Sequence, residues 1–188
     1  MQGLALIDYD NVCGHRNRSK SDFEPHTEGL VDAVAQTFRS VFPSVRELDL
    51  RLYGGWLDER GDFSPAALSL FEVLPVLRRR RHGLIVRPSL ATTLVQLPDL
   101  VLQSTVRLQA RRRRQKMVDG MLGCDAMSIV AEGLTRVGVI TDDDDLLPAT
   151  LSAHAASAGL VVWMPLVSHI FSTTAASAGS GHAVAREA

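Results

Sequence analysis

The chain has 188 residues, of which 46% are hydrophobic, and a formal net charge of −1 at pH 7, which suits one globular domain with a tail. Its two cysteines, Cys13 and Cys124, exclude a disulfide framework and lack the spacing of zinc ligands. No apolar run is long enough to cross a bilayer, and Asp8 and Asp10 interrupt the apolar start, so we expect neither a signal peptide nor a membrane partner. A cytoplasmic location is the resulting expectation.

The first half of the chain alternates predicted strands and helices. Five apolar or small residues before Asp8 predict a buried strand, and alternating leucines predict a second strand. Pro43 ends the first predicted helix, and Ser64-Pro65 is a typical start for the next. In order, the elements are a strand at 3–7, a polar loop at 13–28, a helix at 29–42, a strand at 47–53, a helix at 66–80, and a strand at 83–87 stopped by Pro88.

The second half continues this alternation. The apolar strand predicted at 137–141 leads directly into four aspartates, Asp142–Asp145. The predicted elements are a strand at 105–110, a helix at 118–132, a strand at 137–141, a helix at 146–158 ended by Gly159, and a strand at 160–164. From residue 172 onward Ala, Ser, Gly and Thr dominate, so we expect one domain over 1–171 and a disordered tail over 172–188.

Strands that alternate with helices predict an α/β fold with a mainly parallel sheet. The strands are short continuous apolar runs, which fits a sheet that helices cover on both faces. In such sheets, functional sites form beyond the carboxyl ends of the strands. We therefore look for functional side chains where predicted strands end.

Acidic residues stand at these positions. Asp8 follows the first strand, Asp142–Asp145 follow a later one, and Asp119 opens a helix after the candidate strand at 105–110. Converging carboxylates repel each other, and hard oxygen ligands suit Mg²⁺ or Mn²⁺. A single Asp in such a place is more often a helix cap, but capping uses one residue and the run holds four. The set therefore favours a metal site.

Four segments in chain order resemble NYN domains, a branch of the PIN-like nuclease superfamily. They are the string Ala5-Leu-Ile-Asp-Tyr-Asp-Asn11, the string Arg51-Leu-Tyr-Gly-Gly-Trp56, the helix start Lys116-Met-Val-Asp119 with Asp125 six residues later, and the string Thr141-Asp-Asp-Asp-Asp-Leu-Leu-Pro148. The resemblance spans about residues 3–165. It implies a Rossmann-like, three-layer PIN-like fold and metal-dependent cleavage of RNA rather than DNA, most often as an endoribonuclease.

The resemblance also implies roles for individual residues. The catalytic, metal-binding carboxylates would be Asp8, Asp119, Asp143 and Asp145. Asp125 would be a further, supporting acid at the metal. The other supporting residues would be Asn11, which orients the first loop, Lys116 and Asp142. Asp142 replaces the glycine of the family's last motif and Asp144 its small residue, so the register within the run can shift by one. A homo-oligomer or a regulatory protein partner is a family-level expectation.

Basic residues predict a path for the substrate. The run Arg111–Arg114, with Arg107 before it and Lys116 after it, leads into Asp119. Cations beside a metal site hold a phosphate backbone without reading its sequence, so we expect Arg107, Arg111, Arg112, Arg113 and Arg114 to bind nucleic acid. Trp56 and Tyr53 could stack on a base, although a packed aromatic is an equal interpretation for Trp56. The run Arg78–Arg81 is as well explained by a solvated face.

Two other functions remain open at this level. The string Asp8-Tyr-Asp-Asn-Val12 also fits a haloacid-dehalogenase-like phosphatase, in which Asp8 would be the nucleophile and Asp10 the general acid and base. Lys116 would then neutralise the phosphate, and Asp142 with Asp143 would hold Mg²⁺. A non-catalytic RNA- or protein-binding scaffold of the same fold is the second. A dinucleotide-binding protein is disfavoured, because no Gly-x-Gly-x-x-Gly follows the first strand.

Overall fold

The computed structural model describes residues 1–13, 20–57, 60–97, 99, 106–109, 112–115, 117–132, 136–157 and 161–164. The predicted tail at 172–188, Gly159, Arg111 and Lys116 lie outside the described residues. For Arg107 and Arg112–Arg114 the structure describes the backbone alone.

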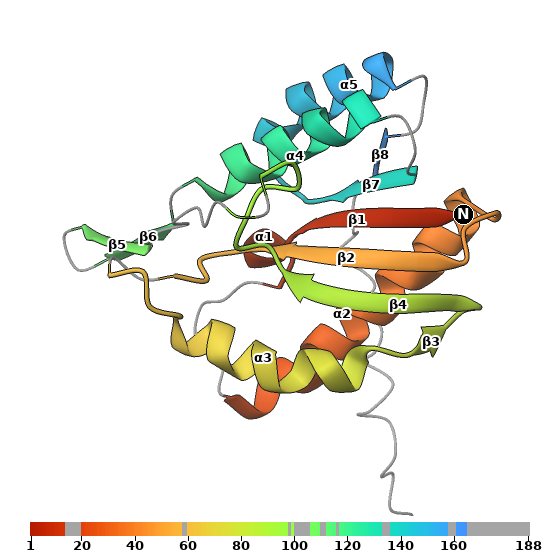
Figure 1. The fold of residues 1–188 in the computed structure, drawn as a ribbon. Helices are drawn as coiled ribbons and strands as arrows, with labels where there is room; N and C mark the ends of the chain where they lie inside the picture. Colours follow the sequence, from red (N-terminus) through yellow and green to blue (C-terminus); the bar gives the residue numbers. More distant parts are fainter. Residues whose placement is uncertain are drawn as a thin grey trace, which may run out of the picture.

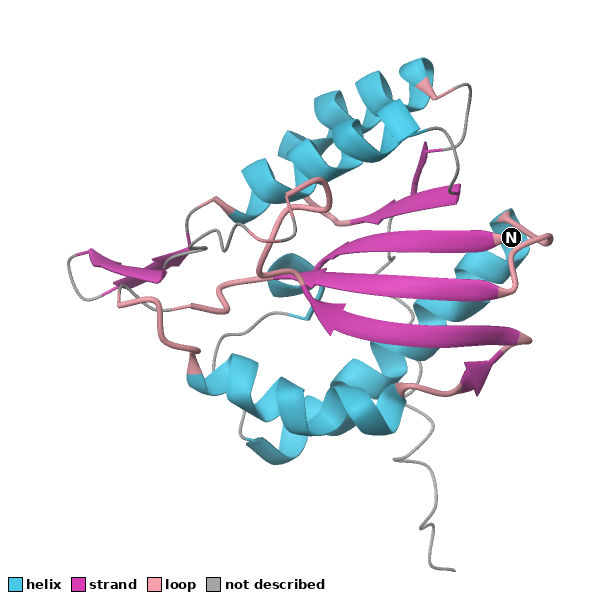
Figure 2. Cartoon of the chain, in the orientation of Figure 1, coloured by secondary structure: helices cyan, strands magenta, loops and turns pink. Residues whose placement is uncertain are grey.

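The centre of the molecule is a six-stranded sheet with the order β3-β4-β2-β1-β7-β8 (Figures 1 and 2). All neighbouring strands are parallel except β3 and β4, which are antiparallel. The strands of this sheet are β1 (Gln2–Asp8), β2 (Glu47–Tyr53), β3 (Arg80–Arg81), β4 (Leu84–Leu90), β7 (Arg136–Ile140) and β8 (Val161–Trp163). The predicted α/β class with a mainly parallel sheet is thus confirmed.

Helices cover both faces of the sheet, which gives three layers (Figure 1). The helices α1, α2 and α3 lie on one side, and α4 and α5 lie on the other. Their bounds are α1 (Tyr9–Cys13), α2 (Lys20–Val41), α3 (Pro65–Leu77), α4 (Val118–Glu132) and α5 (Leu147–Ala156), with a short 3₁₀ helix η1 (Asp144–Leu146) before α5.

The strand pattern explains the two cores between these layers. Leu48, Leu50 and Leu52 of β2 alternate along the strand and are fully buried in the core shared with α2 and α3. Tyr53 points to the opposite face and belongs to the second core, beside Leu122 of α4. Because side chains of a strand alternate between faces, one strand supplies both cores.

Three elements begin or end differently from the sequence prediction. The helix predicted at 66–80 ends at Leu77, and Arg80 lies in the strand β3 instead. The helix α2 begins at Lys20, within the predicted polar loop, and contains Pro25. The strand β4 continues through Pro88, which was expected to stop it. The backbone N–H of Ile85 donates to the carbonyl of Arg46, just before β2, and that of Ala91 donates to Leu52 of β2. Odd positions of β4 therefore face β2, and the nitrogen of Pro88 faces the other side, where the short β3 pairs only with Leu84 and Ile85.

The predicted strand at 105–110 lies outside the central sheet. It forms a separate two-stranded antiparallel hairpin, β5 (Val106–Gln109) with β6 (Arg112–Gln115). The expectation that Asp119 follows a strand of the main sheet is therefore wrong. The alternation of apolar residues indicated a strand correctly but could not indicate its partner, which is the arginine run itself.

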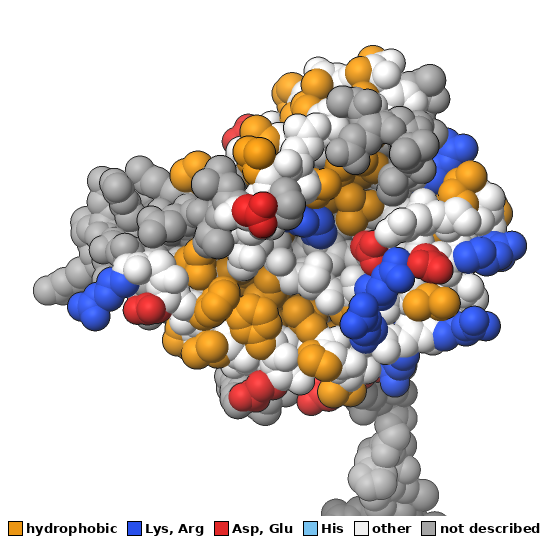
Figure 3. Space-filling view, viewed as in Figure 1, with side chains coloured by type: hydrophobic (Ala, Val, Ile, Leu, Met, Phe, Trp, Pro, Cys, Tyr) orange, Lys and Arg blue, Asp and Glu red, His pale blue; other side chains and the backbone are white. Residues whose placement is uncertain are grey.

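The outer face of α3 is unusually apolar for a surface helix. Phe63, before the helix, and Leu68, Phe71 and Val76 on it are 42–61% exposed, and Figure 3 shows hydrophobic side chains gathered over this region. Glu72 is the only charged residue within α3. Among the described helices, none combines the length and the apolar composition needed to span a bilayer.

Candidate metal centre

Asp8 is the last residue of β1, and later strands of the sheet are added on both sides of this strand. The next strand in sequence, β2, pairs with one side of β1, and β7 pairs with the other. This arrangement is a topological switch point, where open α/β sheets form their sites. Asp8 is 1% exposed, so a carboxylate is buried at this edge.

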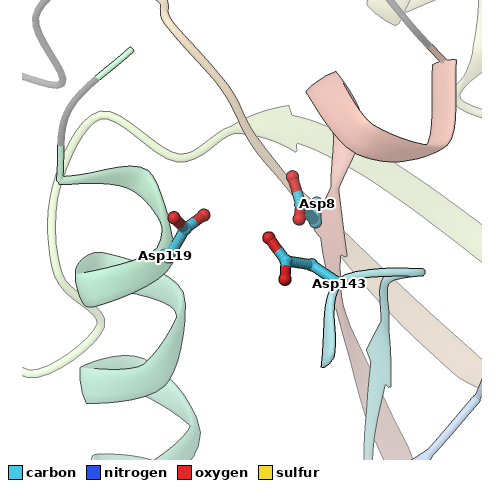
Figure 4. Close-up of side chains that lie close together, drawn as sticks. All are labelled: Asp8, Asp119 and Asp143. Atoms are coloured by element: carbon cyan, nitrogen blue, oxygen red, sulfur yellow. The ribbon is translucent and has the colours of Figure 1, made fainter. Parts of the chain in front are cut away.

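Two more aspartates reach the same place from other elements. Asp119 lies in the first turn of α4, and Asp143 caps η1 just after β7. Each of the three residues offers a carboxylate oxygen within 4.8 Å of the other two. Figure 4 shows Asp119 pointing from its helix toward Asp8 and Asp143. Three residues that lie far apart in sequence thus converge: Asp119 is 111 positions after Asp8, and Asp143 is 24 positions after Asp119.

Neutral donors hold two of these carboxylates in place. The side-chain nitrogen Nδ2 of Asn11 donates to Oδ2 of Asp8 at 2.7 Å and to Oδ2 of Asp143 at 3.1 Å. The hydroxyl of Thr141 donates to Oδ2 of Asp8 at 2.9 Å and accepts the backbone N–H of Asp143 at 3.0 Å. Both donors therefore link β1 to the turn after β7.

The sequence interpretation gave Asn11 an orienting role but assigned none to Thr141. Thr141 is fully buried and directly follows Ile140, which is paired in register with Ile7. One hydroxyl side chain before an acidic run is too common a pattern to stand out. Its only signal was its place after a buried strand, beside the residue that follows the neighbouring strand.

Burial and mutual repulsion make this cluster costly to ionise. Burial raises the pKa of Asp8, and the Asp119 charge adds to the rise, while the hydrogen bonds from Thr141 and Asn11 oppose it. The pKa of Asp119 is also raised, first by partial burial and then by the charges of Asp143 and Asp145. A divalent cation between the carboxylates would offset these costs. The set of carboxylate oxygens fits Mg²⁺ or Mn²⁺, which prefer such ligands.

The structure distinguishes between the four aspartates of the run. Asp143 belongs to the converging group, and the other three are exposed. Asp145 donates its backbone N–H to Oδ1 of Asp143 at 2.9 Å and acts on Asp119 through its charge. Partial burial raises the pKa of Asp142. Of the expected register, Asp143 lies within the cluster and Asp145 lies at its rim.

Asp125 does not lie in the cluster, contrary to its expected place at the metal. It is fully buried, and both of its oxygens bind protein groups. Oδ1 accepts the backbone N–H of Val95 at 2.6 Å, and Oδ2 accepts the hydroxyl of Tyr53 at 2.5 Å and lies 3.5 Å from the Arg51 guanidinium. A helix turns 100° per residue, so six residues place Asp125 away from the direction of Asp119.

The two aromatic residues expected to stack on a base are buried. Trp56 is 0% and Tyr53 is 1% exposed, so neither presents a ring to a ligand. The Trp56 indole N–H donates to the carbonyl of Leu52 at 2.7 Å, and its ring packs so closely over Gly54 that a Cβ there would lie 2.7 Å from it. The Gly-Gly-Trp string is therefore a packing motif, and the packed interpretation of Trp56 is the correct one.

Asp10 turns to a different partner from Asp8. Its Oδ2 accepts the backbone N–H of Gly55 at 3.0 Å, and it is not part of the converging acidic group.

The run Arg78–Arg81 also has structural partners, because Arg79 and Arg81 both pair with Glu28 of α2. Arg81 is buried and also pairs with Asp32.

The second arginine run lies in the β5–β6 hairpin, which directly precedes the helix of Asp119 in the chain. Its register pairs Arg107 with Arg114 and Leu108 with Arg113. The hairpin lies beyond the carboxyl ends of the strands, on the side where α4 begins (Figure 1). Only two residues, 116 and 117, lie between the end of β6 at Gln115 and the start of α4 at Val118.

Comparisons of the chain with protein-family models, with curated proteins and with solved structures gave no match.

Proposed function

We propose that this protein is a metal-dependent nuclease that hydrolyses phosphodiester bonds in RNA. The observation that carries the proposal is the convergence of Asp8, Asp119 and Asp143 within 4.8 Å at the switch point of the sheet. A divalent cation held by these carboxylates would supply an activated water and stabilise the charge of phosphoryl displacement. The resemblance to NYN domains leads to the same reaction.

The residues of the site divide this work according to burial. Asp8 is buried and fixed by Asn11 and Thr141, so it provides an ordered ligand oxygen. Asp119 is exposed, and so it stands on the side from which a substrate approaches. Asp145, at the exposed rim, adds negative charge that favours a cation.

Two features favour a polymeric phosphodiester over a small phosphate ester. The arginines of the β5–β6 hairpin precede the Asp119 helix and would hold a phosphate backbone. Asp10, which a haloacid-dehalogenase-like phosphatase needs as its general acid, is bonded to the backbone of Gly55. RNA, rather than DNA, follows from the family resemblance.

Digestion of labelled RNA and DNA, single- and double-stranded, with Mg²⁺, Mn²⁺ or EDTA tests the proposal. Cleavage of RNA with either metal, and none with EDTA, is the expected result. A circular single-stranded RNA in the same assay reports cleavage within the chain, which is the mode we expect. Asp8→Asn and Asp143→Asn should each lower the rate about 100-fold or more, because loss of a metal ligand removes several kcal/mol of transition-state stabilisation.

Asp144→Asn is the matched control, because Asp144 is an exposed member of the same run outside the converging group. It should cleave at nearly the wild-type rate. Cleavage that survives EDTA, or equal rates for Asp8→Asn and wild type, would contradict the proposed site. An aluminium-fluoride adduct on Asp8 would instead favour the phosphatase.

A further inference from the structure

A second cluster of polar side chains, centred on the buried Asp125, joins three segments of the chain. It consists of Arg51 and Tyr53 at the end of β2, Asp125 in α4, and the backbone of Thr93 and Val95. Tyr53 and Val95 donate to the two oxygens of Asp125, and Arg51 donates to the carbonyl of Thr93 while lying beside Asp125. The Arg51 guanidinium also lies 5.8 Å from the centre of the Tyr53 ring.

Tyr53 and Asp125 are each connected by the backbone to an aspartate of the candidate metal centre. Tyr53 is the register partner of Asp8 on the neighbouring parallel strand. Asp125 is six residues after Asp119 in the same helix, about 9 Å along the helix axis. The hydrogen bond from Tyr53 to Asp125 therefore connects the strand pair that carries Asp8 to the helix that carries Asp119.

Asp119 needs such a connection more than the other two acids do. Asn11 and Thr141 already link Asp8 to Asp143 and its backbone, and all four residues lie within three positions of the ends of the adjacent strands β1 and β7. Asp119 comes from a different layer of the molecule. Among the described residues, no hydrogen bond joins its carboxylate to either of the other two.

We infer that Tyr53 and Asp125 are positioning residues, which set the place of Asp119 against Asp8 and Asp143 and thereby the affinity of the site for its cation. The inference rests on the proposed function in so far as it takes these three acids to be ligands. It gives Asp125 a role that requires no contact with the metal, and Tyr53 one that requires no contact with a base.

The chemistry of the cluster suits a fixed link. Burial raises the pKa of Tyr53 well above its ordinary value, and Asp125 adds to the rise, so the phenol keeps the proton that it donates. The buried Asp125 carboxylate faces two N–H or O–H donors and one guanidinium, which satisfy it. Residues that hold metal ligands in this indirect way typically change metal affinity 10- to 100-fold when they are replaced.

Tyr53→Phe tests the inference, because it removes the hydroxyl and keeps the ring. Tyr9→Phe is the matched control: Tyr9 is equally buried, and its hydroxyl is hydrogen-bonded to Thr27 at 2.8 Å on the opposite face of the sheet. Binding of Mn²⁺ to each folded protein is measured by the electron paramagnetic resonance signal of the free ion. RNA cleavage is measured over a range of Mn²⁺ concentrations, and unfolding is followed by circular dichroism.

We expect Tyr53→Phe to bind Mn²⁺ about 10-fold more weakly and to need about 10-fold more Mn²⁺ for half-maximal cleavage, with an RNA KM and a rate at saturating Mn²⁺ close to wild type. Tyr9→Phe should lower the melting temperature about as much as Tyr53→Phe does, because each variant loses one buried hydroxyl, and it should leave Mn²⁺ affinity unchanged. Asp125→Asn, which keeps the shape of the side chain but weakens its pairing with Arg51, should change Mn²⁺ affinity in the same direction.

The outcomes separate this inference from the proposed function. Equal Mn²⁺ affinity in wild type and Tyr53→Phe, or an equal loss in Tyr9→Phe, overturns the positioning role and leaves the nuclease intact. Mn²⁺ binding that weakens in Tyr53→Phe, in a protein that cleaves no nucleic acid, supports the positioning role and overturns the nuclease. A wild-type protein that binds no Mn²⁺ overturns both.

Discussion

A single amide and a single hydroxyl organise the acidic residues of the site. The Asn11 amide has two hydrogens, and it shares them between Asp8 and Asp143. The Thr141 hydroxyl has one hydrogen, which goes to Asp8, and its oxygen accepts from the backbone of Asp143. Each carboxylate thereby keeps an ordered position in spite of the repulsion between them, and it keeps free lone pairs for a cation.

Thr141→Val is the sharpest test of this arrangement at a single residue. The hydroxyl favours the ionised form of Asp8, so its removal raises the pKa of Asp8 further. Because Asp8 must be ionised to hold a cation, the acid limb of the pH–rate profile should move to higher pH. Loss of a buried bond to a charged group should lower the free energy of unfolding by about 1–3 kcal/mol.

Rates of RNA cleavage at several pH values and fixed Mn²⁺, with urea unfolding, measure both effects. Thr141→Ser keeps the hydroxyl and should retain the wild-type pH profile. A Val variant with an unchanged acid limb, or a Ser variant that shifts as far as Val, would mean that the hydroxyl does not act on Asp8.

The places of the candidate site residues could be predicted from sequence only in part. Asp8 and Asp119 were selected because of their places in predicted elements, and both lie in the cluster. The resemblance gave Asp143 and Asp145 together, with a register that could shift by one residue. That Asp143 is the member of the run that reaches the cluster depends on the turn into η1, which four identical residues cannot reveal. Asp125 was misplaced, and the stacking interpretation of Trp56, one of the two left open, was wrong, because sequence gives a residue's type and not the direction in which its side chain points.

Among the elements, the β5–β6 hairpin pairs two strands that both carry arginines, which repel each other. Its register places Arg107 directly opposite Arg114, and like charges in this position destabilise a strand pair. A two-stranded hairpin outside a larger sheet is also only marginally stable. A bound polyanion would relieve the repulsion, which favours the interpretation of this hairpin as a surface for the substrate backbone.

The double variant Arg112→Gln/Arg114→Gln tests that role. If both residues bind phosphates, the KM for single-stranded RNA should rise several-fold with little change in kcat. The slope of log KM against log salt concentration should fall by about 1.4, since each phosphate contact contributes about 0.7 for single strands. Kinetics at four or five salt concentrations give both quantities.

Arg78→Gln is the control for the loss of positive charge. Arg78 is exposed at the end of α3, next to the β3–β4 pairing and away from the carboxyl ends of the strands. It should leave KM and the salt slope unchanged. An unchanged slope in the double variant would remove the hairpin from the substrate path.

Element types were largely predictable from periodicity, while partners and boundaries were not. Apolar spacing located the strands at 3–7, 47–53 and 137–141 close to where they lie. The polar first turns of α2, with Pro25, carry no apolar stripe, so the helix was predicted to begin too late. The partner of β5 was missed because a run of arginines has no strand-like alternation.

At the scale of the whole molecule, the topology brings acidic residues together at one edge of the central sheet. The net charge of −1 conceals a partly buried acidic cluster at the switch point and arginine runs elsewhere in the chain. Without a cation, ionisation of this cluster costs stability, because burial and repulsion raise the pKa values of Asp8 and Asp119. The arrangement of acids that would hold a cation therefore opposes the stability of the metal-free fold.

This opposition predicts how stability depends on pH and metal. A carboxyl group whose pKa is higher in the folded than in the unfolded state binds more protons when folded, so its contribution to stability falls as pH rises from the unfolded value of 3.8 through the folded one. Asp119→Asn removes that loss. Without metal, the variant should therefore melt above wild type at neutral pH, and the difference should vanish in acid, where wild-type Asp119 is protonated.

Divalent metal should reverse the order of the two proteins. Mn²⁺ at about 100 times its dissociation constant stabilises a folded protein by about 2.7 kcal/mol, which for a domain of this size raises the melting temperature by roughly 5–10 °C. The wild type should show this rise and Asp119→Asn only a small part of it. Circular dichroism melts with Mn²⁺ and with EDTA, at pH 4 and pH 7, measure all four conditions. A wild type that gains no stability from Mn²⁺, or a variant that gains as much, would mean that Asp119 does not hold the ion, whatever the distances between the carboxylates.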